Sequence, residues 1–589
     1  MISLLLLILP LCLAAIYERA ADLPTQDFDY IIVGGGTAGN VLANRLTEQP
    51  DLSILVLEAG RSTADVLTSL VPFFCTAPEW PLDWNFTTIP QLGLNGRVFP
   101  YLRGFGLGGC SATNIMTYTR GSSEDYGRYA RLSGDEGWRW DQMQPYFQKN
   151  ERFVAPADHH NITGQYNPAV HNFEGINSVS LAEYPSDVDG RVIQATKELS
   201  DEFPFNLDYN SGYHLGVGWH QKTIGNGTRS SSETSYLGSE YINRVNLYVL
   251  VNSHVTRILV ATDSTVDDES EPYFNSVEFT QDAGKTTYTL SAREEIILSA
   301  GVIGTPHILL NSGVGSADEL SALGITPMLH LPDVGKNMTD QVSMRLSWAV
   351  NDTQMVESVY WRNETFQEEV LAKWQSDRSG FLANPPSNQL GFFRLKDVLM
   401  EEESCAGNQT GHYELVFSGG MDTLPVPAGG SYFTALVNIL CPLSRGNVTV
   451  NSTNPLSPPV INPNVLTHAQ DLMQMKHAIG GAQRFAAAPV WADYILELSV
   501  DIGDLEGSIR TQARPAGHSV GTASMSPLHA HWGVVDPDLK LKRAKGVRIV
   551  DASVLPYVPA AHTQAPVYAV AERAADLIKR GKFPETHAA

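Results

Sequence analysis

The stretch "FDYIIVGGGTAGNVLANRLTEQPDLSILVLEAG" (28–60) constrains the fold of this chain more than any other. Residues 28–33 form a short apolar run, residues 38–46 repeat apolar side chains at helical spacing, and residues 53–57 form a second apolar run. This order predicts a β-α-β unit with two parallel strands joined through a helix. The chain is therefore expected to contain an α/β domain built around a parallel sheet.

The turn of this unit reads Gly34-x-Gly36-x-x-Gly39. In such a turn the first glycine permits the tight bend, the second lets backbone N–H groups approach a pyrophosphate, and the third allows close packing of helix and strand. Glu58 ends the second strand 19 residues after Gly39, where a carboxylate can accept hydrogen bonds from ribose hydroxyls. The unit predicts a dinucleotide site without separating FAD from NAD.

Length and charge limit the organisation and the partners. A chain of 589 residues exceeds the roughly 250–300 residues of a single hydrophobic core, so two domains are expected. The net charge of −24 would repel nucleic acid phosphates and anionic membranes, which favours a small-molecule partner, with neither nucleic acid nor membrane involved. We also expect the protein to be a monomer.

The N-terminal residues "MISLLLLILPLCLAAIYERAA" predict a secretory signal peptide over residues 1–20. The alternative is a membrane anchor, but the apolar run over residues 2–16 is shorter than the roughly 20 residues that span a bilayer. Secretion to the extracellular space also agrees with nine N-x-Ser/Thr sequons, which suggest a glycoprotein. They are Asn85, Asn161, Asn226, Asn337, Asn351, Asn363, Asn408, Asn447 and Asn451.

Four cysteines remain after such a signal is removed, namely Cys75, Cys110, Cys405 and Cys441. Their spacing matches no CxxC or Cys/His metal motif, so no metal site is expected. Four cysteines allow three pairings, and the sequence does not choose among them. Cys405 with Cys441 is the first pair to test.

Further along the chain, residues 246–260, 286–301 and 545–553 read as strands, and residues 565–581 read as a helix. Because β-α signals occur near both ends of the chain, we expect the nucleotide domain to be assembled from distant segments.

Five more stretches follow the β-α-β unit of residues 28–60, and their order and separations are specific. They are "RGFGLGGCSATNIMTYTRGS" (103–122), "AGVIGTPHILLNSGVG" (300–315), "DVGKNMTDQ" (333–341), "HSVGTASM" (518–525) and "VDASVLPYVPAAHTQAP" (550–566). From about Asp27 to Arg580 the chain resembles the glucose-methanol-choline (GMC) oxidoreductases, and within them the fungal aryl-alcohol oxidases most.

The resemblance implies a Rossmann-like FAD-binding domain plus a substrate-binding domain with a mixed or antiparallel sheet, which is an α/β fold, or α+β overall. The implied boundaries follow the signal peptide (1–20). They are an FAD-binding region (27–325) with substrate-domain insertions at about 70–100 and 155–235, a substrate-binding domain (326–510) and a C-terminal FAD-domain segment (511–589).

The family also implies which residues hold FAD. Gly34, Gly36, Thr37, Ala38 and Gly39 would bind the pyrophosphate, Glu58 the ribose and Val255 the adenine; Cys110, Asn114 and Thr117 would face the flavin, and Asp551, Ala552, Thr563 and Gln564 would close over it. Some members attach the cofactor through a histidine before the Gly-Gly pair. The stretch "YLRGFGLGG" has none, so non-covalent FAD is expected.

Two histidines, His518 and His562, lie 44 residues apart in family motifs. A neutral imidazole can take a hydroxyl proton near neutral pH, because its unperturbed pKa is about 6.5. The resemblance implies that His518 is the base and that His562 orients the substrate oxygen. It further implies a secreted FAD-dependent oxidase that converts aryl or allylic primary alcohols to aldehydes and reduces O2 to H2O2.

Two other activities stay open. One is a sugar oxidase or a dehydrogenase with a quinone acceptor, and the other is a hydroxynitrile lyase that keeps FAD without redox turnover. Gly517 and Leu94 occupy positions where aryl-alcohol oxidases usually carry aromatics, and Ser519 replaces a usual proline, which predicts a wider pocket. Other aromatics could line the substrate pocket in place of the missing ones, or they could belong to the hydrophobic core. They are Phe392, Phe393, Phe417, Tyr432 and Phe433.

Overall fold

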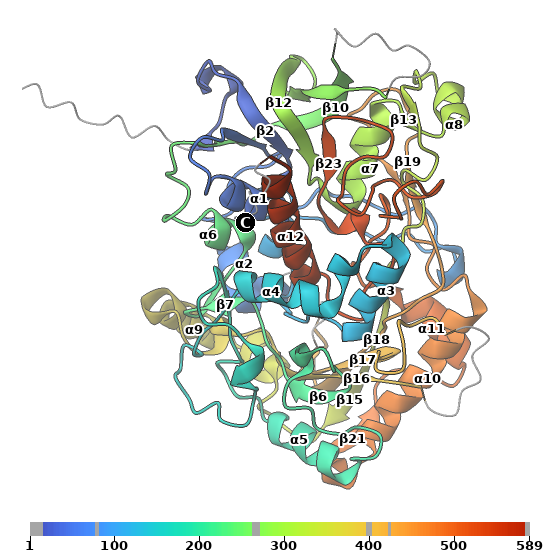
Figure 1. Cartoon of the computed structure of the whole chain (residues 1–589). Helices are drawn as coiled ribbons and strands as arrows, with labels where there is room; N and C mark the ends of the chain where they lie inside the picture. The colour runs from blue at the N-terminus through green and yellow to red at the C-terminus, as the bar shows by residue number, and fades with distance from the viewer. Residues whose placement is uncertain (1–15, 77–81, 262–270, 396–402, 422–425, 583–589) are drawn as a thin grey trace, which may run out of the picture.

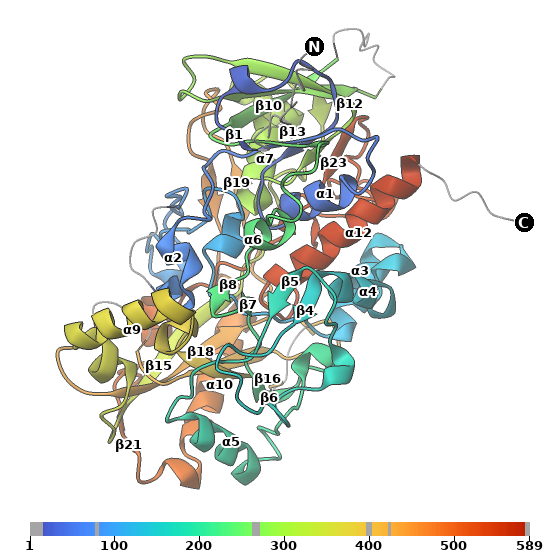
Figure 2. The same cartoon turned by 90° about the vertical axis from the view of Figure 1, so that its left-hand side faces the viewer.

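The computed structural model of the chain describes residues 16–76, 82–261, 271–395, 403–421 and 426–582. Two large sheets divide the molecule. Figures 1 and 2 show the first sheet in the upper half and the second in the lower half. This arrangement confirms the expected two-domain α/β architecture with a nucleotide domain and a mixed or antiparallel second domain.

The first sheet contains the predicted β-α-β unit. Strand β2 (Phe28–Val33), helix α1 (Gly39–Leu46) and strand β3 (Ile54–Leu57) follow one another, and the two strands pair in parallel. The sheet order is β1-β9-β3-β2-β12-β11-β10, with β23 also on β12. The remaining strands are β1 (Ile16–Tyr17), β9 (Leu247–Leu250), β10 (His254–Val260), β11 (Phe274–Thr280), β12 (Tyr288–Leu298) and β23 (Val547–Ile549).

Segments far apart in the sequence thus meet in one layer. The C-terminal helix α12 (Gln564–Lys582) packs against α1 and against α4 (Trp140–Asn150), and it runs beside α1 in Figure 1. The strands expected at 286–301 and 545–553 and the helix expected at 565–581 are present, whereas the stretch 246–260 forms two strands, β9 and β10. Buried apolar residues from all of these elements form one core.

The second sheet is antiparallel, with the order β16-β17-β18-β15-β21 and β22 paired to β15. Its strands are β15 (Val342–Val350), β16 (Ser387–Phe393), β17 (Tyr413–Ser418), β18 (Tyr432–Ile439), β21 (Ile495–Leu498) and β22 (Arg514–Pro515). One face packs on helix α10 (Ala469–Ala486). The opposite face carries Glu414. Its carboxylate contacts His562, which lies in the C-terminal segment that leads into α12.

The core between this sheet and α10 settles the role of several aromatics. Phe393, Phe417 and Phe433 are buried there, so the core interpretation of these three is correct. Leu94 is fully buried in the same core. The expectation that Leu94 widens the substrate pocket is therefore wrong, because its side chain packs inside the second domain.

Of the four cysteines, two form a disulfide and two are thiols. Cys405 and Cys441 form a disulfide with a Cα–Cα distance of 5.2 Å, which confirms the pair chosen for testing. Cys75 is a buried thiol and Cys110 an exposed one.

The N-terminal edge of the first sheet conflicts with the predicted end of the signal peptide. Ile16 and Tyr17 form strand β1, which pairs in parallel with β9, and Tyr17 belongs to the core. Cleavage after Ala20 would remove this strand. Within the described part of the chain, no helix is both long and apolar enough to cross a membrane.

Replacing Gly39 with alanine should destabilise the first domain. An added Cβ would lie 1.9 Å from the carbonyl oxygen of Gly34, so α1 would have to move away from β2. We expect the free energy of unfolding to fall by about 2–3 kcal/mol. The measurement is urea unfolding followed by tryptophan fluorescence, in which the midpoint should move to a lower urea concentration. The matched control is Gly190→Ala on α5 (Asp189–Glu198), where an added Cβ has no neighbour within 4 Å. Equal midpoints for the two variants would contradict the packing argument.

Candidate active site

The turn before α1 has the shape of a phosphate cradle. Gly34 has φ +102°, and a Cβ there would lie 2.5 Å from the carbonyl oxygen of Ser299. At Gly36 the nearest atom to an added Cβ is the Cα of Gly109 at 3.8 Å, so this part of the backbone is open to a ligand. Ala38 precedes α1 without capping the helix with a side chain. Gly34 thus makes the predicted tight bend and Gly39 the predicted close packing, and the open backbone at Gly36 fits a pyrophosphate.

Glu58 lies beside this cradle, at the end of β3. Its carboxylate accepts hydrogen bonds from the backbone N–H groups of Gly35 (2.8 Å) and Gly60 (3.0 Å). Burial raises its pKa, and the bonds from Gly60 and Gly35 oppose that rise. The backbone N–H of Ser253 donates to the Glu58 carbonyl at 2.7 Å, which brings the start of β10 to the same place. Val255, two residues on, is buried in the core.

Asn114 and Gln564, which were assigned to the flavin from separate motifs, contact each other through their side chains. Asn114 Oδ1 also accepts from Arg229 Nη1 at 2.9 Å, and Gln564 Nε2 donates to Thr223 Oγ1 at 3.0 Å. The neighbouring Thr117 Oγ1 lies 2.9 Å from His220 Nε2. Two distant segments are therefore joined by partly buried side-chain hydrogen bonds.

The carboxylate of Asp551 is used within the protein. Oδ2 accepts from the Gly301 N–H (2.9 Å) and from Thr305 Oγ1 (2.6 Å), and Oδ1 accepts from the N–H and hydroxyl of Ser553. The side chain thereby fastens the start of α7 (Gly301–Asn311) to the C-terminal segment. The cofactor contacts expected at Asp551 and Ala552 stay a prediction.

The two predicted catalytic histidines meet. The rings of His518 and His562 lie 4.5 Å apart between centroids, at an interplanar angle of 65°. His518 Nδ1 is 2.7 Å from Gln341 Oε1. His562 Nε2 is 3.0 and 3.1 Å from the two carboxylate oxygens of Glu414, and its backbone N–H donates to Thr119. The pair thus joins the C-terminal segment to the second sheet.

The surroundings of His518 suit a base. Burial, and then the nearby His562 and Arg103, lower the pKa of His518 well below its ordinary value of 6.5. A lowered pKa keeps the imidazole neutral, with one nitrogen able to accept a proton. The candidate base is therefore in its active form at neutral pH.

Gly517 is required by the backbone. Its φ of +83° lies in the left-handed region that favours glycine, and its N–H donates to Asp340 Oδ2 at 3.2 Å. A Cβ added at Gly517 would lie 3.7 Å from Arg103 Nη1. The other terminal nitrogen of Arg103, Nη2, donates to the Ser519 hydroxyl. The absent aromatic thus reflects a particular loop conformation beside an arginine.

The sequence analysis missed several residues that hold the histidines. Asp340 accepts from the His518 N–H at 2.7 Å and from the Tyr101 hydroxyl at 2.6 Å. Asp340 and Gln341 end the quoted motif "DVGKNMTDQ", so their position was visible although their role was not. Glu414 gave a weaker signal, as a single carboxylate in the apolar strand "YELVFS".

A row of polar side chains crosses the second sheet next to His562. Ser343 pairs with Asn438, and Asn438 pairs with Glu414, in the register of β15, β18 and β17. Asn438 Nδ2 donates to Glu414 Oε2 at 2.6 Å. We call Ser343, Asn438 and Glu414 the polar row. Paired residues share a face of a sheet, so the row lies on the side that faces the histidines.

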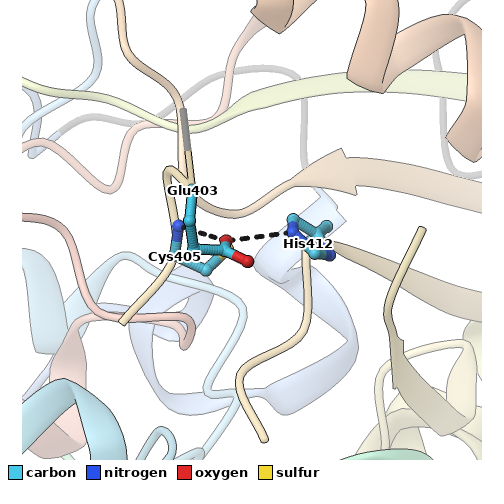
Figure 3. Close-up of side chains that lie close together, drawn as sticks. All are labelled: Glu403, Cys405 and His412. Carbon is cyan, nitrogen blue, oxygen red and sulfur yellow. Dashed lines mark hydrogen bonds and ion pairs between the residues drawn. The ribbon is translucent and has the colours of Figure 1, made fainter. Parts of the chain in front are cut away.

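Figure 3 shows a second cluster, Glu403, Cys405 and His412, which has the residue types of a metal site. The sulfur of Cys405 is already bonded to Cys441. His412 Nδ1 accepts from the Leu395 N–H, which leaves Nε2 to carry a hydrogen toward Glu403 at 3.2 Å. The cluster is therefore a hydrogen-bonded support for the disulfide.

Comparisons with known proteins agree with this geometry. The GMC oxidoreductase family models match residues 28–343 and 442–571. Dehydrogenase eriK of Hericium erinaceus is 40% identical over 96% of this chain and 97% of that protein. Pyranose dehydrogenase 3 of Leucoagaricus meleagris is 39% identical over 96% of this chain and 95% of that protein.

Solved structures show the same fold. A formate oxidase from Aspergillus oryzae, studied for the modification of its FAD, superposes with a TM-score of 0.85 at 26% identity, over 95% of this chain and 99% of that one. A fungal aryl-alcohol oxidase gives 0.81 at 24% identity, over 94% and 99%. This chain belongs to the GMC oxidoreductase family, and its cofactor is FAD.

Proposed function

We propose that this chain is an FAD-dependent dehydrogenase that oxidises a CH–OH group of a polyhydroxylated, sugar-type substrate. The observation that carries the proposal is the polar row, which presents Glu414, Asn438 and Ser343 beside the histidine pair. Glu414 is already paired with His562 and Asn438, but among the described residues the Asn438 Oδ1 is buried without a hydrogen-bond partner, so a substrate hydroxyl could donate to it whereas an apolar ring could not. Two relatives with dehydrogenase names, one of them a pyranose dehydrogenase, support it.

The protein side chains divide the work as follows. His518, neutral and turned toward His562, would take the hydroxyl proton through its free nitrogen. His562, held through Nε2 by Glu414, would orient the substrate oxygen. Bound FAD would supply the acceptor for the hydride that leaves the carbon. The absence of the covalent histidine motif leaves non-covalent binding as a prediction.

Oxidation of aryl or allylic primary alcohols by O2 is the second candidate. It is favoured by the next row of the sheet, where Leu436, Val416 and Leu390 pair in register and offer an apolar surface on the same face. Arg345 stands at the end of that row, on β15. The two candidate functions therefore predict that different alcohols reduce the flavin.

A panel of alcohols tests the choice. Sugars, benzylic alcohols and allylic alcohols are added to the holoenzyme without oxygen, and loss of the flavin absorbance is followed. We expect sugars to bleach the flavin, and a quinone to restore the colour faster than O2 does. Faster bleaching by benzylic alcohols with rapid reoxidation by O2 would favour the second candidate. Unchanged absorbance with every alcohol, together with cleavage of mandelonitrile, would favour a hydroxynitrile lyase.

The rate of flavin reduction should persist into mildly acidic solution. The base works when neutral, and a pKa lowered well below 6.5 keeps it neutral as the pH falls through that value. The acid limb of the pH profile, measured by anaerobic stopped flow, should therefore lie below pH 6.5. The control His518→Ala should reduce the rate about 100- to 10,000-fold at every pH. A limb above pH 6.5 would exclude His518 as the base.

We further propose secretion, with signal cleavage at or before Ile16, because β1 then stays in the sheet. N-terminal sequencing of protein recovered from the medium of a secreting host should start no later than Ile16. A start after Ala20 would contradict this.

Among the sequons, Asn337 should carry no glycan, because its side-chain nitrogen donates to Ser524 and to the Pro556 carbonyl. Mass spectrometry of glycopeptides checks that expectation.

A further inference from the structure

Gln341 is a fully buried residue that touches both histidine segments. It stands directly before β15. Its side-chain nitrogen donates to the Pro559 carbonyl at 3.0 Å and lies 3.3 and 3.4 Å from the carbonyl oxygens of Leu440 and Ala561. Pro559 and Ala561 belong to the segment that leads into His562.

This surrounding fixes the orientation of the amide. All three neighbours of the nitrogen are carbonyl oxygens, which can only accept hydrogen bonds. If the amide were reversed, its oxygen would face three other oxygens in a buried site, and the hydrogen bond to the Pro559 carbonyl would be lost, which is costly. The amide oxygen of Gln341 must therefore point the other way, toward His518.

The orientation of the amide in turn fixes the tautomer of His518. The oxygen of Gln341 accepts at 2.7 Å, so Nδ1 of His518 has to carry the hydrogen. A neutral imidazole has one hydrogen, so Nε2 holds the lone pair. Among the described residues, no hydrogen-bond partner reaches Nε2, which stays available to a substrate hydroxyl.

We infer that Gln341 is a positioning residue that locks His518 as the Nδ1–H tautomer and leaves Nε2 as the base. The inference rests on the proposed function only in giving His518 the role of base. Asp340 holds the backbone N–H groups of Gly517 and His518, while Gln341 holds the ring, so two consecutive residues fix both parts of the base.

Other charged groups near the ring do not compete for Nδ1. Arg103 bonds to the Leu102 carbonyl and approaches Ser519, and the Tyr101 hydroxyl donates to Asp340. Glu414 is directed to Nε2 of His562. Gln341 is thus the partner that decides which nitrogen of His518 is protonated.

The first test needs no substrate. Holoenzyme labelled with ¹⁵N-histidine is examined by long-range ¹H–¹⁵N NMR, and the signals of His518 are assigned with His518→Ala. We expect a protonated Nδ1 and an unprotonated Nε2 at neutral pH. The opposite tautomer in the unmodified protein would overturn the inference without any Gln341 variant, and it would do so even if no alcohol reduces the flavin.

Variants of Gln341 supply the second test. Gln341→Met keeps the length of the side chain but has no acceptor oxygen, so the His518 signals should become those of a tautomer mixture. Gln341→Glu keeps an acceptor toward His518 and, with its carboxyl protonated, can still donate to the Pro559 carbonyl, so it should retain the Nδ1–H form. Anaerobic flavin reduction should fall about 10- to 100-fold in Gln341→Met, as for loss of an outer partner of a functional histidine, and less in Gln341→Glu.

The matched control is Gln354→Met, at an exposed glutamine, which should alter neither readout. If Gln341→Met lowered the thermal midpoint and the rate but left the His518 signals as in the unmodified protein, Gln341 would be merely structural and the inference would be wrong. If the signals changed as expected while no alcohol reduced the flavin, the proposed function would fail and the tautomer lock would stand.

Discussion

The pairing between residues 339–343 and residues 514–520 is the constraint on which the rest of the site depends. Thr339 and Val520 exchange backbone hydrogen bonds at 3.1 and 3.0 Å, and the Ala516 N–H donates to the Gln341 carbonyl at 2.9 Å. One segment leads into the second sheet, and the other leads toward β23 of the first sheet. His518, the proposed base, is therefore carried on a ladder that joins the two halves of the molecule.

This ladder makes the polar groups of the site depend on one another. Asp340, Gln341 and Glu414 are all buried, and each is satisfied by a group that belongs to a histidine segment or leads into one. A buried polar group without a partner is costly, so the network is stable only when both halves are in place. Burial has a second effect, because it lowers the pKa of His518 and keeps the base neutral.

The proposed reaction and the choice of substrate depend on different parts of the structure. The C-terminal segment supplies both histidines and, through Asp551, is fastened to the first half. The second sheet supplies the face opposite them, with the polar row nearest to His562. Family membership follows from the first part, whereas the choice between sugar and aryl substrates depends on the second.

The sequence by itself determined the β-α-β unit, because glycines at fixed offsets encode local geometry, and the resemblance of its short motifs implied the FAD family and the histidine pair. The sequence left three cysteine pairings open, and the structure shows the Cys405–Cys441 bridge. It could not place Leu94, whose alignment suggested a pocket wall, since burial depends on which segments pack together. Nor could it show that Gly517 needs a left-handed backbone or that Gln341 faces His518. Those relations are contacts between residues far apart in the sequence, such as Gln341 and His518 at 177 positions, or a local φ angle, and only the tertiary structure decides them.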